Sequence, residues 1–308
     1  MATKTFNPQR PFRCRDAHAA GISRKDLENG GYHRLMQDCW IDAGVPMTPR
    51  LMIAAAMLVL PRATCATHHT AARLQRGIVP DSCVIHLGGD RSFTSNRPEV
   101  RAHRYGSPPE TTFVRGLRVT TTVQTTLDLA EELDLVDLVV LADSFARYDE
   151  DFPAKFTAAA MACRTRGAKR ARRAAALTRT GVESPHETRL RLLMVLAGLP
   201  EPVVNLELHD DEGRVRYRID LSYPEFGVAI EYDGRHHIAR EDQWQGDLLR
   251  REDVEGDHWR FVVVVATDLF VTPERTLQRI TRVMRDRGMH VPSLDPTWRR
   301  FFPGRLGV

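Results

Sequence analysis

The sequence predicts a mixed α/β (α+β) fold that is divided into more than one domain. Its 308 residues exceed the size of one ordinary domain, and an apolar share of 42% is enough to build buried cores. Segments with the helical spacing of apolar residues alternate with short alternating runs that are typical of strands. The net charge is only +4, but one long stretch of the chain carries cations and no acid. We therefore expect separate modules joined by a basic segment.

The first 46 residues have the pattern of two short helices followed by a strand pair. Residues 12–20 suit the first helix, Ser23 caps a second helix over 24–29, and Gly30-Gly31 ends it. The order AAGISRKDLENGGYHRL resembles the winged-helix amino-terminal domain of AbiEi-type antitoxins, the repressor halves of abortive-infection toxin–antitoxin pairs. Residues 38–40 read Asp-Cys-Trp where that family has a Gly-Val-Tyr-like step. The resemblance implies a DNA-binding domain, residues 1–46, with contacts from Arg24, Lys25, His33 and Arg34.

Residues 47–150 predict a small αβ middle domain. Its segments GLRVT and TTLDLA resemble the central domain of AbiEi-type proteins, in which such a basic module supports DNA binding or contacts to a toxin. His68 and His69 have no acid or cysteine at ligand spacing, so we interpret them as a capped helix start. The expected helices are 51–60, one beginning at 66–74, and 126–133; the expected strands are 83–87, 100–105 and 117–122.

Residues 151–182 predict a basic helical linker. From position 152 to 182 there are eight cations and no acid. Arg166 is expected to share a helical face with the later cations, although Gly167 can interrupt the helix. Such a stripe either neutralises backbone phosphates without reading sequence or is a solvated connecting helix. The residues expected to contact phosphate are Lys169, Arg170 and Arg173.

The segment RVRYRIDLSYPEFGVAIEYD, residues 214–233, predicts a hairpin with facing acids. Two alternating apolar runs flank Pro-Glu-Phe-Gly, a turn sequence. A turn centred on 225 and 226 places Asp220 opposite Glu231 and puts Asp233 on the same face. Like charges opposite one another destabilise a sheet unless a cation lies between them. Hard oxygen ligands suit Mg²⁺ or Mn²⁺, so we predict a metal site held by Asp220 and Glu231.

An Asp, ten intervening residues, then Glu-x-Asp, on a hairpin preceded by a helix, resembles the PD-(D/E)XK nuclease superfamily. More narrowly, residues 187–282 resemble the endonuclease-like domain of very-short-patch-repair enzymes. For residues 183–290 the resemblance implies a restriction-endonuclease-like mixed sheet flanked by helices, followed by a tail at 291–308. It also implies Mg²⁺-dependent hydrolysis of DNA phosphodiester bonds. The matching segments are SPHE (184–187), AGLP (197–200), IDL (219–221), EYDG (231–234), His237, Asp247, Arg251 and HWR (258–260).

The third catalytic position departs from the superfamily pattern. A lysine is expected two residues after the second acid, where it would stabilise developing negative charge, but Asp233 stands there. Asp233 is instead a further metal ligand or orients water. The related repair-type domains use nearby histidines, so His236 or His237 is expected to act as acid or base. The alternative is that both histidines lie in an exposed turn.

Three further residues take roles from the resemblance and have simpler interpretations beside them. The superfamily's helix acid corresponds to Glu187, whose spacing from Ser184 also fits a capping box. Gln243 is expected near the active centre, and Arg251 on a phosphate or an acid. The alternative for Arg251 is an exposed i,i+4 ion pair with Asp247.

Two functions follow from these patterns. The first is a metal-dependent DNA endonuclease; the second is a non-catalytic DNA-binding regulator, the antitoxin of a type IV AbiEi-like system. Five scattered cysteines without a CxxC pair indicate reduced thiols and make structural zinc unexpected. The longest apolar run, 51–60, is too short to span a bilayer, and no secretory signal is visible. We expect a cytoplasmic protein whose partner is DNA, with a toxin or a second copy of the chain as further partner.

Overall fold

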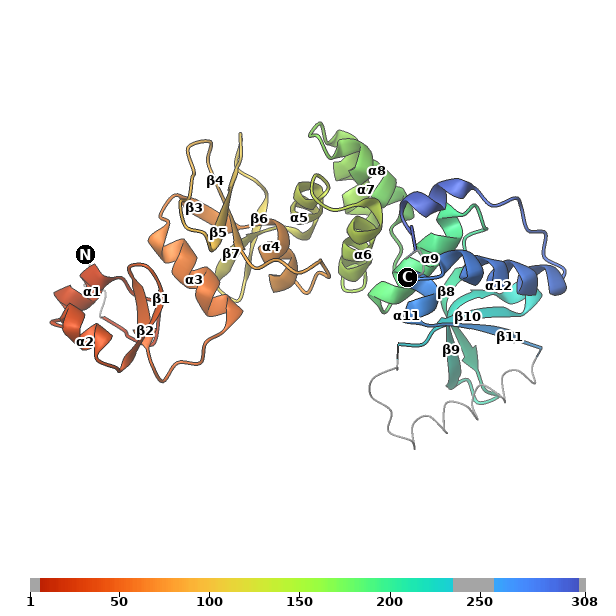
Figure 1. Ribbon diagram of the computed structural model, residues 1–308, viewed down its shortest axis with the longest axis horizontal. Coiled ribbons are helices and arrows are strands. Elements are labelled where there is room, and N and C mark those ends of the chain that lie inside the picture. Colours follow the sequence, from red (N-terminus) through yellow and green to blue (C-terminus); the bar gives the residue numbers. More distant parts are fainter. Residues whose placement is uncertain (1–5, 235–257, 305–308) are drawn as a thin grey trace. The chain divides into compact units, whose positions relative to one another are not determined.

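The structure is a computed structural model that describes residues 6–234 and 258–304. The chain divides into two compact units: Met1–Glu132 with Ala162–Ala168, and Leu133–Met161 with Lys169–Val308. The fold is α+β, with sheets flanked by helices, as the sequence predicts (Figure 1). Within the described ranges, no helix has the length and apolar character needed to cross a membrane.

The first unit begins with the expected helix pair and strand pair. The helices are α1 (Cys14–Ala19) and α2 (Arg24–Glu28), and the antiparallel strands are β1 (Tyr32–Met36) and β2 (Cys39–Asp42). The Ser23 hydroxyl accepts a hydrogen bond from the Asp26 backbone N–H at 3.2 Å, which caps α2. Phe12, Leu27 and Trp40 form a small core beneath these elements. The predicted element order is confirmed here.

The rest of the first unit is a five-stranded mixed sheet with strand order β5-β4-β3-β7-β6. Two of its strands, β3 and β6, are not predicted by the sequence; β3 ends at Ala66, and the helix predicted from 66 begins at His68. The β3 sequence ATCA has small residues without strong alternation, so the sequence pattern does not identify it as a strand. The elements are α3 (Pro49–Val59), β3 (Ala63–Ala66), α4 (His68–Leu74), β4 (Ile85–Gly89), β5 (Val100–Arg104), β6 (Thr111–Val114), β7 (Leu117–Thr120) and α5 (Thr122–Leu129).

The basic segment forms two helices, α7 (Phe152–Ala162) and α8 (Ala168–Leu177). Arg166 lies between them, so the expectation that it shares a helical face with Arg170 and Arg173 is wrong. Gly167 lies in this break, and only glycine fits there, because an added Cβ would lie 2.7 Å from the Ala130 carbonyl carbon. α8 is amphipathic: its buried residues are Ala168, Ala171, Ala174 and Ala175, and its exposed cations are Lys169, Arg170 and Arg173.

The second unit is built on a four-stranded mixed sheet with strand order β11-β10-β9-β8. All neighbours are antiparallel except β10 and β11, which are parallel. Helices α9 and α12 both contact β10 and also contact each other (Figure 1). The elements are α6 (Leu135–Ala146), α9 (Pro185–Leu196), β8 (Val203–His209), β9 (Val215–Tyr223), η1 (Pro224–Phe226), β10 (Val228–Tyr232), β11 (Arg260–Val264), α11 (Ala266–Phe270), α12 (Pro273–Asp286) and η2 (Pro296–Arg300).

The β9–β10 hairpin has the register that the sequence predicts. Ser222 pairs with Ala229 and Leu221 with Ile230. Gly227 ends the turn with a φ of +59°, and an added Cβ there would lie 2.6 Å from the His258 carbonyl oxygen. The turn therefore needs glycine both for its left-handed backbone and for this close approach. A fixed turn fixes which residues face one another on the two strands.

Candidate metal centre

Three acidic residues lie on three neighbouring elements of the second unit and influence one another electrostatically, although their carboxylate oxygens do not all lie within 4.8 Å of one another. Asp220 lies on β9 and Glu231 on β10, each one residue beyond the Leu221–Ile230 pair of the ladder. Glu187 is the third residue of α9, a helix that contacts both β9 and β10. The hairpin and the helix start thus bring together carboxylates that are 11 and 33 residues apart in sequence.

Asp220 is mostly buried beside other acids. Its Oδ2 accepts a hydrogen bond from the Tyr232 backbone N–H at 2.9 Å, which favours the charged form. Burial outweighs this bond and, with the charges of Glu187, Glu231 and Glu183, raises the pKa of Asp220 to about 7. A divalent cation would remove this repulsion, because it stabilises the charged form of every carboxylate around it.

Glu231 is held in place by a tyrosine that sequence patterns do not identify. Its side chain is buried, with 7% of its surface exposed, and its Oε1 accepts a hydrogen bond from the Tyr217 hydroxyl at 2.7 Å. The Tyr217 ring meets the Phe261 ring edge to face at 5.8 Å. Tyr217 belongs to the part of β9 that continues past Asp220, so only the folded sheet brings it to Glu231.

Glu187 both closes the start of α9 and lies among the acids near Asp220, the two roles that the sequence offers for it. Its backbone N–H donates to the Ser184 hydroxyl at 3.1 Å, and its carboxylate accepts from the Glu183 N–H at 2.9 Å. These bonds close the start of α9, as a capping arrangement does. The same carboxylate is buried and raises the pKa of Asp220, so capping and a place in the acid cluster coexist.

Of the remaining predicted catalytic residues, only Asp233 lies in the described part of the chain. Asp233 follows the last residue of β10, and its backbone N–H donates to the Val264 carbonyl at 2.8 Å. His186, which belongs to the SPHE segment of the resemblance, stacks on the Tyr232 ring, with the ring centres 4.4 Å apart and an angle of 7° between the planes. The other predicted site residues lie outside the described residues: His236, His237, Gln243, Asp247 and Arg251.

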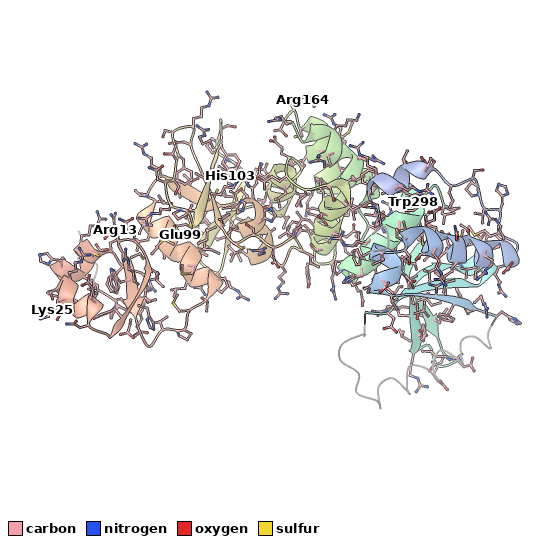
Figure 2. The ribbon with its side chains drawn as sticks, in the orientation of Figure 1. Arg13, Lys25, Glu99, His103, Arg164 and Trp298 are labelled. Atoms are coloured by element: carbon pink, nitrogen blue, oxygen red, sulfur yellow. The ribbon has the colours of Figure 1, made fainter. Side chains whose placement is uncertain are left out.

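Seven of the residues expected to contact DNA lie in the described part of the chain, where they are exposed and divided between the two units. In the first unit they are Arg24, Lys25, His33 and Arg34, and Figure 2 shows Lys25 on α2. Arg24 pairs with Glu28 at 2.9 Å along the same helix. In the second unit they are Lys169, Arg170 and Arg173, on the exposed face of α8. The Arg173 guanidinium also lies 5.1 Å from the Phe301 ring centre.

A buried ion pair fixes α9 beneath the acid cluster. Arg191 is fully buried, and its guanidinium donates to Asp143 of α6 at 2.9 Å and to Glu201 at 2.8 Å. Asp143 also accepts from the Thr188 hydroxyl at 3.0 Å. Buried charges need such partners, because an unpaired charge in the interior is strongly destabilising. The network joins α6 to α9 and thereby positions the helix start that carries Glu187.

Comparison with known proteins gives partial matches. No family model matches the chain. Two proteins of Mycobacterium tuberculosis, uncharacterized protein MT2308 (strain CDC 1551 / Oshkosh) and uncharacterized protein Rv2248 (strain ATCC 25618 / H37Rv), are each 30% identical over 100 residues. The match covers 32% of this chain and 36% of each relative, so it spans about a third of their length. The crystal structure of RV2827C protein from Mycobacterium tuberculosis is 13% identical with a TM-score of 0.39, covering 66% of this chain and 84% of that chain.

Proposed function

We propose that the second unit is a metal-dependent endonuclease that hydrolyses DNA phosphodiester bonds. The observation that carries the proposal is the pKa of Asp220, which burial and the charges of Glu187, Glu231 and Glu183 raise to about 7. A cluster of this kind is costly without a cation, and oxygen ligands alone favour Mg²⁺ or Mn²⁺. Perturbed carboxylates also concentrate at functional sites.

The donor set fits the proposed ion, and the chain's own residues have separable roles. Asp220 and Glu231 would hold the ion, which when bound polarises the scissile phosphate and lowers the pKa of an attacking water. Tyr217 orients the Glu231 carboxylate through its 2.7 Å hydrogen bond. Glu187 adds negative charge beside Asp220 and strengthens the preference for a cation. Asp233 or His237 would orient or deprotonate the water in the absence of the superfamily lysine.

DNA binding by the same unit would use the exposed cations of α8. Lys169, Arg170 and Arg173 lie on one helix with no acid among its residues. Cations on a helix surface bind backbone phosphates without reading the base sequence. We therefore propose that the second unit by itself cleaves DNA with little dependence on the base sequence of the DNA. The protein would act on DNA in the cytoplasm.

A second candidate is a DNA-binding regulator without catalysis, of the AbiEi-like antitoxin type. Two observations favour it: Asp233 stands in the place of the catalytic lysine, and each clustered acid already accepts a hydrogen bond from the protein. The helix pair and strand pair at the start of the chain expose Arg24, Lys25, His33 and Arg34, which would then provide the binding function. A toxin or a second copy of the chain would be its partner.

Plasmid cleavage with Mg²⁺ or Mn²⁺ distinguishes the two candidates. The endonuclease proposal predicts nicking or cutting that disappears in Asp220→Ala, while the affinity for DNA is unchanged. Asp211→Ala, in the exposed β8–β9 turn, removes the same charge and should cleave like the wild type. Equal cleavage by wild type and Asp220→Ala would refute the proposal. Tight DNA binding without any cleavage by the wild type would support the regulator instead.

A further inference from the structure

The first unit contains a buried group of histidines that the sequence does not reveal. His68 and His69 begin α4, His86 lies on β4, and His103 lies on β5, where Figure 2 labels it. The His68 and His103 rings stack with their centres 3.5 Å apart and an angle of 23°. The His86 ring lies 5.1 Å from the His103 ring and nearly parallel to it. Four imidazoles from three elements thus converge on one place.

An acid completes the group, which corrects the interpretation of His68 and His69 as only a helix start. Glu132, after α5, lies with its Oε1 4.0 Å from His68 Nε2 and its Oε2 3.5 Å from His69 Nε2. One potential ligand atom from each of His68, His103 and Glu132 lies within 4.8 Å of the other two. The acid is 64 residues from His68, so motif spacing does not predict this contact.

Hydrogen bonds leave one ring nitrogen free on each of the two stacked histidines. His68 Nδ1 lies 3.0 Å from the Thr67 hydroxyl, which in turn donates to Asp128 at 2.9 Å. His68 Nδ1 can therefore carry its proton and donate to Thr67, so that the lone pair lies on Nε2, the atom near Glu132. A carboxylate that orients a histidine through a hydrogen bond is a common support of metal ligands.

The second chain of hydrogen bonds orients His103 in the same way. Its Nε2 lies 2.9 Å from His86 Nδ1, and His86 Nε2 lies 3.0 Å from the Ser82 hydroxyl. The Ser82 hydroxyl can itself donate a hydrogen bond to the Val84 carbonyl oxygen at 3.4 Å. If each group donates along this chain, the lone pair of His103 lies on Nδ1. Within the described part of the chain, no hydrogen-bond partner occupies that nitrogen.

Burial lowers the pKa of His68, His86 and His103 and so favours their neutral form, which is the form that binds metal. It lowers the pKa of His68 to about 2 and that of His86 to about 3, and the neighbouring histidines add to the effect. Glu132 is balanced by Arg101, whose guanidinium lies 3.3 Å from Oε1. The Arg101 side chain is 58% exposed, so it can turn towards solvent when another cation takes its place.

We propose that His68, His103 and Glu132 form a binding site for one divalent transition-metal ion, with zinc the preferred ion. Two imidazoles and one carboxylate are ligands that zinc accepts, whereas Mg²⁺ prefers oxygen alone. Three protein ligands leave a fourth position for water or a substrate atom, the arrangement of catalytic zinc sites. His86, Ser82, Thr67 and Asp128 orient the ligands and do not touch the ion. This site is independent of the proposed nuclease centre.

The test measures zinc affinity in the full chain with Asp220→Asn as the parent, so that the acid cluster of the second unit does not contribute. Metal-free protein is titrated with Co²⁺, whose visible absorption reports nitrogen and oxygen ligands, and Zn²⁺ is then added in competition. The parent should bind one equivalent. His103→Ala and Glu132→Gln should each weaken zinc binding by at least about 100-fold, and Ser82→Ala by about 10-fold. His18→Gln, an exposed histidine on α1, should bind like the parent.

Circular dichroism of each variant separates loss of a ligand from loss of fold. If His103→Ala does not fold, Glu132→Gln alone shows whether these residues bind zinc, because Glu132 is partly exposed and its replacement disturbs the core less. No zinc binding by the folded parent would overturn the proposal. So would unchanged affinity in folded His103→Ala or Glu132→Gln. A loss confined to these variants, with His18→Gln unaffected, would establish the site without any reference to DNA cleavage.

Discussion

Replacing Asp220 by asparagine should stabilise the protein, and the gain should grow with pH. The change is nearly isosteric, and the asparagine oxygen can still accept the Tyr232 N–H bond. In wild type, burial and then the neighbouring acids raise the pKa of Asp220 from 3.8 to about 7. The unfolded chain therefore ionises this group at lower pH than the folded protein does. Folding stability is lost as pH rises from about 4 to about 7, and the loss is constant above that.

The magnitude follows from the size of this shift. One pKa unit corresponds to about 1.4 kcal/mol, so the raised pKa of Asp220 lowers the free energy of unfolding by about 4 kcal/mol at pH 8, and by about 2 kcal/mol at pH 5, where only the unfolded chain is ionised. Asparagine does not titrate and removes this cost. The free energy of unfolding of Asp220→Asn should thus exceed that of wild type by about 2 kcal/mol more at pH 8 than at pH 5.

Urea denaturation in the presence of a chelator measures this difference, with circular dichroism as the signal. Asp211→Asn, in the exposed β8–β9 turn, is the control for the loss of one charge and should show no such pH dependence. Adding Mg²⁺ at pH 8 should stabilise wild type by about 3 kcal/mol at a hundred times the dissociation constant, and Asp220→Asn much less. Equal differences between wild type and Asp220→Asn at both pH values would refute the reasoning.

Two further variants test the buried Arg191–Asp143 ion pair and the basic helix α8. Arg191→Met leaves Asp143 buried without its cation and should lower the free energy of unfolding by about 3–5 kcal/mol; a loss below about 1 kcal/mol by urea denaturation would contradict the role given to this pair. Arg170→Ala with Arg173→Ala should weaken binding to DNA of every sequence. The slope of log affinity against log salt concentration should become shallower by the amount that corresponds to the loss of up to about two phosphate contacts. Arg214→Ala, at a residue paired with Asp210, is the control, and an unchanged slope in the double variant would exclude α8 from DNA binding.

Local patterns in the sequence predict the hairpin and the amino-terminal elements well. The turn residues ending at Gly227 set the β9–β10 register, and Ser23 sets the start of α2, because each acts on its immediate neighbours. The small residues of β3 lack alternation, so that strand is recognised only from its pairing with β4 and β7. The prediction for Arg166 is wrong because α7 ends at Ala162 and α8 begins only at Ala168, and the close approach of Gly167 to Ala130 is a tertiary contact that the sequence does not reveal.

The acid cluster and the histidine group differ in how far the sequence predicts them. Asp220 and Glu231 share one hairpin, so alternation and turn position are enough to bring them together. Tyr217 reaches Glu231 only because β9 continues beyond the hairpin pairing. His103 and Glu132 meet His68 across separate elements, and no periodicity links residues so far apart. Sites within one supersecondary element are predictable from sequence, while sites assembled from several elements require the fold.

Calorimetric titration of Mn²⁺ into the full chain, with duplex DNA present, tests the central claim most directly. Glu132→Gln serves as the parent, so that the histidine group does not contribute. We predict that the parent takes up metal and that Asp220→Asn with Glu231→Gln abolishes this uptake while DNA binding persists. No uptake by the parent, or the same uptake by the double variant, would contradict a metal ion held between these two carboxylates.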